Sequence, residues 1–267
     1  MLKDITLGQF FPGNSPLHRM DPRFKIVLVM VYIVVLFVAK GIYAYALIAA
    51  FNALAMALSR IRVRLLLRGL RPMLFIVLFT AILNMIYVSG EHVLVSFWVI
   101  TITWEGVYAA AYMVARIVLL ISATLLLTYT TSPIMLTDAI ERLLGPLKKI
   151  RVPVHEFAMM MTIALRFIPT LIEETDKIMS AQKARGADFE SGNIFRRAKA
   201  LVPLLIPLFV SAFRRADELA LAMECRCYHG GEGRTRMRVL HAARIDFLAL
   251  AVCAVWFGGV ITLGILL

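Results

Sequence analysis

The sequence predicts an all-α membrane protein with about five transmembrane helices and long amphipathic cytoplasmic helices between the fourth span and the last. Hydrophobic residues make up 61% of the 267 residues, well above the roughly 45–50% that is usual in globular proteins. These residues are gathered in long runs that short basic segments separate. The formal net charge of +12 then follows from the Lys and Arg that membrane proteins keep on the cytoplasmic side.

Residues 1–131 are predicted to form a cytoplasmic N-terminal loop and a block of four membrane helices. Residues 26–58 form one apolar run whose single charge is Lys40. As one helix the run would be roughly 50 Å long, whereas the bilayer core is about 30 Å thick. Two helices that meet at Lys40 and Gly41 fit better, and we expect Lys25 and Lys40 to extend their amines to opposite interfaces.

Orientation is indicated most clearly by the basic segment 59–71, which contains no acidic residue and which we expect as a short cytoplasmic loop. Residues 72–88 then cross outward. Residues 89–106 contain no Lys or Arg and are predicted as an external hairpin or interfacial segment. Residues 107–131 cross back, and Arg116 within them is expected to pair with a polar neighbour or extend to the interface. The arginines of the basic segment are Arg60, Arg62, Arg64, Arg68 and Arg71.

Residues 132–245 are predicted to form a cytoplasmic domain of long helices. Between Ser132 and Arg244 there are 18 basic and 12 acidic residues, a charge density that favours the cytoplasm. Ser132 and Pro133 are typical of a helix start. Residues 246–267 form the last predicted span, which places the C-terminus outside the cell and the N-terminus in the cytoplasm. An alternative count adds crossings at 157–172 and 201–213, for seven in total.

Two long helical patterns in this domain each end on an arginine. The first, 154–185, ends at Ala184-Arg185-Gly186, and the second, 193–227, ends at Cys225-Arg226-Cys227. An arginine in the last turn is favoured by the helix dipole alone, so each end has an ordinary structural explanation. A planar guanidinium at an exposed helix tip can also form paired hydrogen bonds with a partner carboxylate. The repetition favours this second interpretation.

The N-terminal segment resembles the opening signature of the transmembrane T component (EcfT/CbiQ family) of energy-coupling factor (ECF) transporters. It begins Pro12-Gly13-Asn14-Ser15-Pro16-Leu17 and continues His18-Arg19-Met20-Asp21-Pro22-Arg23. That family also ends two cytoplasmic coupling helices with x-Arg-Gly motifs, which Ala184-Arg185-Gly186 matches. The second motif keeps the usual lead-in Ala222-Met223-Glu224, but Cys227 replaces the glycine. Because a Cβ resists the left-handed conformation, we expect a helix end of altered shape there, with Gly230-Gly231 as a later ending.

The resemblance implies a non-catalytic coupling subunit of an ATP-driven importer for vitamins or other micronutrients. Two ABC ATPases would dock on the coupling helices, one arginine motif each, and would supply ATP and Mg, so that this chain itself binds no cofactor. A membrane-embedded substrate-binding S component would pack on another face. The residues expected to form its platform are Met159, Met160, Met161, Leu204 and Leu208, although methionines are also ordinary fillers of apolar gaps.

The sequence contains no G-x-x-x-x-G-K-[ST] phosphate-binding motif, so we expect no ATP hydrolysis by this chain. Cys225, Cys227 and His229 lack a fourth ligand at a usual zinc spacing, and no metal site is expected. Alternatives are a self-contained transporter or channel and the dedicated membrane subunit of a cobalt or nickel importer. A nucleic-acid-binding module ranks last, because aromatic residues do not alternate with the basic ones.

Overall fold

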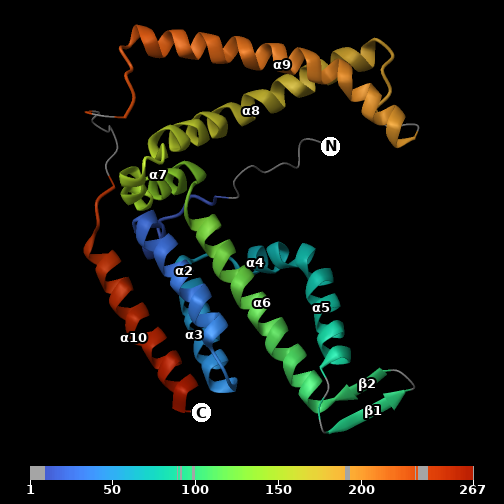
Figure 1. The fold of residues 1–267 in the computed structure, drawn as a ribbon, viewed down its shortest axis with the longest axis vertical. Coiled ribbons are helices and arrows are strands. Elements are labelled where there is room, and N and C mark those ends of the chain that lie inside the picture. The colour runs from blue at the N-terminus through green and yellow to red at the C-terminus, as the bar shows by residue number, and fades with distance from the viewer. Residues whose placement is uncertain are drawn as a thin grey trace. The chain divides into compact units, whose positions relative to one another are not determined.

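A computed structural model describes residues 10–88, 90, 92–97, 100–189, 193–231, 233 and 240–266 (Figure 1). These residues belong to two compact units, one within 140–238 and the other within 8–139 and 239–267. The predicted boundaries at 131 and 245 stay a prediction, and Leu267 lies outside the described residues.

The second unit is built mainly of apolar helices, most of them joined by short turns. Its elements are α1 (Pro16–Arg19), α2 (Pro22–Val38), α3 (Ile42–Ser59), α4 (Val63–Leu70), a 3-10 turn (Arg71–Met73), α5 (Leu74–Tyr87), β1 (Val93–Phe97), β2 (Ile100–Thr103), α6 (Trp104–Thr130) and α10 (Arg244–Leu266). Helix α7 (Pro133–Leu143) follows α6. The first unit contains the end of α7, a 3-10 segment (Gly145–Ile150), α8 (Val154–Ala184) and α9 (Ile194–Cys225).

Among the described residues, five helices are long and apolar enough to cross a membrane on length and composition alone: Gly41–Ser59, Val63–Tyr87, Trp104–Thr130, Val154–Ala184 and Arg244–Gly264. The number agrees with the predicted fold class, but the members differ. Helix α2 has 17 residues and is roughly 26 Å long, slightly short of the bilayer core. Helix α8 is long and apolar enough to cross a membrane, so its location in the cytoplasm stays a prediction.

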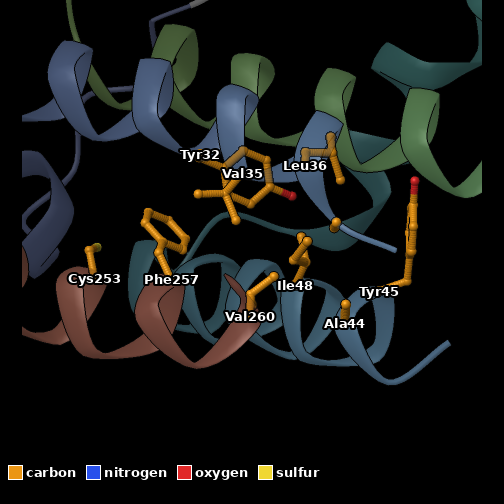
Figure 2. Close-up of a cluster of buried hydrophobic side chains, with 10 residues drawn as sticks. Tyr32, Val35, Leu36, Ala44, Tyr45, Ile48, Cys253, Phe257 and Val260 are labelled. Atoms are coloured by element: carbon orange, nitrogen blue, oxygen red, sulfur yellow. The ribbon is translucent and has the colours of Figure 1, made fainter. Parts of the chain in front are cut away.

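The core of the second unit, which we call the membrane unit, lies between α2, α3 and α10 (Figure 2). Leu36 and Ile48 are fully buried in it, and Phe257 of α10 stacks edge-on against Phe51, which borders it. The amide of Asn52 on α3 donates to the Tyr32 hydroxyl on α2 and to the Ser122 hydroxyl on α6, at 3.0 and 2.9 Å. The buried residues of this cluster are Tyr32, Val35, Leu36, Ala39, Ala44, Tyr45, Ile48, Cys253, Phe257 and Val260.

Gly41, with a φ of +79°, makes the predicted turn between α2 and α3.

Two charged residues of this unit, Lys25 and Arg116, have specific partners. The expectation that Lys25 extends to an interface was wrong. Lys25 is 5% exposed, and its amine donates to the Thr130 carbonyl and the Thr131 hydroxyl. Arg116 pairs as expected, because its guanidinium donates to the Tyr45 hydroxyl at 2.9 Å and lies 5.4 Å from the centre of the Phe37 ring.

One connection differs from the sequence prediction and another agrees with it. The basic segment is not a loop, because α4 occupies most of it and buries Leu66 while Arg64 and Arg68 stay exposed. This helix carries both leucines and exposed arginines, a composition that suits a membrane interface. The predicted hairpin is confirmed as the antiparallel pair β1–β2, in which Val93 faces Thr103 and Phe97 faces Ile100.

The N-terminal signature has a structural role in this unit, since it joins the start of α2 to the start of α10. Asp21 caps α2 by accepting from the Arg23 amide, and it pairs with the Arg23 guanidinium at 2.6 Å. The Asp21 amide donates to the carboxylate of Asp246, which is fully buried and also accepts from the Ala243 amide at 2.7 Å. One carboxylate therefore satisfies backbone donors from two ends of the chain.

Replacement of this carboxylate is predicted to destabilise the membrane unit. Asp246→Ala leaves two amides without an acceptor, and we expect a loss of about 2–4 kcal/mol in the free energy of unfolding. Asp246→Asn keeps one acceptor oxygen and should lose less. Thermal unfolding of the purified chain in mild detergent measures both variants, with Asp217→Ala on the exposed face of α9 as control. Equal midpoints for Asp246→Ala and the control would contradict this role.

Candidate functional site

The two long helices of the first unit, α8 and α9, cross each other (Figure 1). At the crossing the Arg215 guanidinium on α9 donates to the Glu174 carboxylate on α8 at 2.8 Å. The Nε of Arg215 lies 3.5 Å from the Ser211 hydroxyl on its own helix, which helps to hold the arginine toward α8. Both charged groups are partly exposed, so the pair contributes at most about 1 kcal/mol and chiefly fixes where the helices meet.

The Arg185 end of α8 has the predicted geometry. The helix continues to Ala184 past the internal Pro169, and Gly186 takes a left-handed φ of +87°. The Gly186 amide donates to the Lys183 carbonyl, and the Ala187 amide reaches back to the Gln182 carbonyl, both at 3.0 Å. This is the Schellman pattern of helix termination. Ala184, Arg185 and Gly186 are all exposed.

The Arg226 end of α9 has the same backbone, and the expectation of an altered shape was wrong. Cys227 takes a left-handed φ of +53°. Its amide donates to the Glu224 carbonyl at 2.8 Å, and the Tyr228 amide donates to the Met223 carbonyl at 3.1 Å. The two helix-ending hydrogen bonds therefore outweigh the cost of about 1–2 kcal/mol that a Cβ imposes in this conformation. Gly230 lies beyond the helix end, and Cys225, Arg226 and Cys227 are all exposed.

The residues predicted as a platform do not share one exposed surface. Met160 and Met161 are exposed on α8 and Met159 is half-buried. On α9, Leu204 is buried, with 5% of its surface exposed, and Leu208 is half-buried. A broader apolar face of α9 is exposed instead, and sequence reasoning missed it. We call it the α9 face, and its residues are Leu205, Ile206, Phe209, Val210 and Phe213.

Sequence reasoning also missed a chain of polar contacts in this unit, which centres on His155. His155 Nδ1 lies 3.0 Å from a carboxylate oxygen of the buried Glu141 on α7. His155 Nε2 lies 3.2 Å from the hydroxyl of Tyr228. The same hydroxyl lies 3.1 Å from the sulfur of Met159. Residues from α7, α8 and the segment after α9 therefore meet at one point, although up to 87 positions separate them in the sequence.

Comparison with known proteins identifies the family of this chain. Residues 13–237 match the family described as cobalt transport protein, CbiQ. The chain belongs to the CbiQ/EcfT family. It is 55% identical to the energy-coupling factor transporter transmembrane protein EcfT of Ruminiclostridium cellulolyticum, over 98% of this chain and 97% of that protein. Proteins with the same description from Clostridium kluyveri and Bacillus subtilis are 53% and 48% identical, over 95% and 90% of this chain and 94% and 91% of those proteins.

Membership of this family makes the chain the transmembrane T component of an ECF transporter, a multi-pass membrane protein and a transport subunit. It does not favour the alternative of a self-contained transporter or channel. The roles of Arg185 and Arg226 are not given by the comparisons and stay predictions.

From the geometry of the two helix ends we expect opposite effects when the residue in the left-handed conformation is substituted. Cys227→Gly removes an unfavourable Cβ contact and should stabilise the end of α9 by about 1 kcal/mol, whereas Gly186→Ala should destabilise the end of α8 by a similar amount. Hydrogen exchange of the Tyr228 and Ala187 amides in the purified chain measures both effects. Faster exchange of the Tyr228 amide in Cys227→Gly would contradict the observed helix end.

Proposed function

We propose that this chain couples two ABC ATPases to a membrane-embedded S component in an ATP-driven importer of vitamins or other micronutrients. The observation that supports this most is the pair of exposed arginines, Arg185 and Arg226, at the ends of two helices with the same terminal backbone. A guanidinium held at a helix tip presents a rigid set of donors to a carboxylate or a row of carbonyls. Two equivalent tips suit two related ATPase subunits, one each.

The crossing at Glu174 and Arg215 supports a mechanical link between the tips. Helices α8 and α9 have 31 and 32 residues and are each roughly 47 Å long. Because they are joined at the crossing, displacement of one tip by an ATPase is expected to move the other helix as well. In this proposal ATP and Mg are held by the ATPases, and the T component binds no cofactor.

The α9 face supports a second contact, with the S component. Its side chains lie at positions 205, 206, 209, 210 and 213, which is the spacing of one side of a helix. Leaving such a row of leucine, isoleucine and phenylalanine exposed is unfavourable, and rows of this kind mark interfaces with proteins or lipid. An S component, itself a membrane protein, is a suitable apolar partner. The exposed Met160 and Met161 extend the same kind of surface on α8, and flexible thioethers adapt to more than one partner.

We also propose how the chain is oriented in the membrane. The basic segment from Arg60 to Arg71 and the arginine tips face the cytoplasm, where the ATPases are, and the N-terminus lies on the same side. The C-terminus then lies outside the cell.

Charge reversal at both tips is predicted to remove the ATPases from the complex. Charge-assisted hydrogen bonds contribute about 1.5–3 kcal/mol each, so Arg185→Glu with Arg226→Glu should abolish copurification of the ATPases from mild detergent. The single variants Arg185→Ala and Arg226→Ala should each weaken a different ATPase contact, by about 10- to 100-fold. The matched control is Lys148→Glu with Lys149→Glu, which changes the net charge equally at exposed residues outside the two arginine motifs. Normal ATPase recovery with the double tip variant would refute the docking proposal.

Disruption of the α9 face is predicted to separate the other partner. Phe209→Asp with Phe213→Asp places two charges on the surface and should lower recovery of the S component by more than tenfold, while the ATPases remain bound. Phe195→Asp is the control, since Phe195 is exposed on the same helix but lies ten residues, roughly 15 Å, before the first residue of this face. Loss of the ATPases together with the S component would argue that the substitutions unfold α9 instead.

A further inference from the structure

The two arginine tips have the same backbone but differ in the residue that follows the left-handed position. After Gly186 comes Ala187, whose side chain has no hydrogen-bonding group. After Cys227 comes Tyr228, whose hydroxyl reaches His155 on the first turn of α8. The difference between the tips therefore lies at Ala187 and Tyr228 rather than at Gly186 and Cys227.

We propose that Glu141, His155 and Tyr228 form a clamp that fixes the direction in which α9 presents Arg226 to its partner. These three are positioning residues, and this role rests on the proposed docking function. In the clamp the two ring nitrogens of His155 face two partners, the Glu141 carboxylate 3.0 Å from Nδ1 and the Tyr228 hydroxyl 3.2 Å from Nε2. The Tyr228 hydroxyl also donates to the Met159 sulfur at 3.1 Å. The imidazole therefore bridges α7 and the segment after α9.

The position of the clamp in the sequence explains how it acts on Arg226. Tyr228 is two residues beyond Arg226, and its amide already ends the helix by donating to the Met223 carbonyl. Its side chain then attaches the same residue to α8 and α7. One residue thus couples the helix end, through His155, to a buried carboxylate on another element, and only two peptide bonds separate it from the arginine.

The end of α9 needs such an attachment because its own packing is poor. Of residues 216–225, the last ten of the helix, eight are exposed, and only Leu219 and Met223, four positions apart on one side of the helix, are half-buried. The crossing at Arg215 holds the helix ten residues before Cys225, roughly 15 Å away. Without the clamp, a helix end that is held only at this distance would vary in direction. With it, α8 and α9 are joined both at the crossing and at Tyr228.

Hydrogen exchange of the full chain in lipid nanodiscs tests the clamp itself, with no ATPase present. Tyr228→Phe keeps the ring and removes the hydroxyl, so we expect the amides of Arg226, Cys227 and Tyr228 to exchange about two- to tenfold faster. The amides of Arg185, Gly186 and Ala187 have the same backbone bonds without a clamp and should be unchanged. Tyr108→Phe, at an exposed tyrosine of α6, is the matched control. Unchanged exchange at 226–228 would overturn the proposal.

The second measurement uses the assembled transporter. A photocrosslinking residue at position 225 reports the Arg226 contact with an ATPase, and the same residue at position 184 reports the Arg185 contact. Tyr228→Phe and His155→Phe should lower the crosslink from position 225 by about two- to tenfold and leave that from position 184 unchanged. His155→Gln, whose amide can still bond with Tyr228, should restore part of the yield, which a residue that only fills space would not do.

The two proposals fail in different ways. If Arg226→Glu leaves the crosslink from position 225 intact, the docking proposal is wrong and the exchange data alone judge the clamp. If Arg226→Glu abolishes the crosslink while Tyr228→Phe and His155→Phe change neither exchange nor crosslinking, docking stands and the clamp is wrong.

Discussion

Helices α8 and α9 of the T component each end at a residue in the left-handed conformation, Gly186 and Cys227. The positions of Arg185 and Arg226 depend on these two residues. At each of them the chain leaves the helix while the hydrogen bonds from Ala187 and Tyr228 close the last turn. The preceding arginine is left exposed at the tip. Glycine adopts this conformation readily, whereas cysteine does so at a cost, and the helix ends nevertheless have the same hydrogen-bond pattern.

A different constraint organises the membrane unit. Its N-terminal signature lies far from any arginine tip in the sequence, and its role is to satisfy buried polar groups. Asp246 accepts amides from Asp21 and Ala243, and the buried Lys25 donates to Thr130 and Thr131. Within a bilayer unsatisfied polar groups cost several kcal/mol each. Asp21 therefore joins the start of α2 to the start of α10, Lys25 joins α2 to the end of α6, and the apolar cluster packs between α2, α3 and α10.

Much of the fold could be predicted because helical spans and helix ends have local causes. The turn at Gly41, the helix start at Pro133 and the helix end at Arg185 each follow from the residues at that place. Lys25 could not be predicted, because its partners are more than a hundred positions away. Cys227 was predicted incorrectly, since the intrinsic preference of one residue was weighed without the two hydrogen bonds that oppose it. The contact between His155 and Tyr228 has no local signal, because it depends on how α8 and α9 cross.

In the proposed function the two arginine tips engage different ATPases. A structure of the assembled transporter tests this most directly, through the distances from the Arg185 and Arg226 guanidiniums to the ATPase subunits. The prediction is that each guanidinium lies about 3 Å from acceptor oxygens of a separate ATPase. Both tips on one ATPase, or either guanidinium facing solvent in the complete complex, would contradict it.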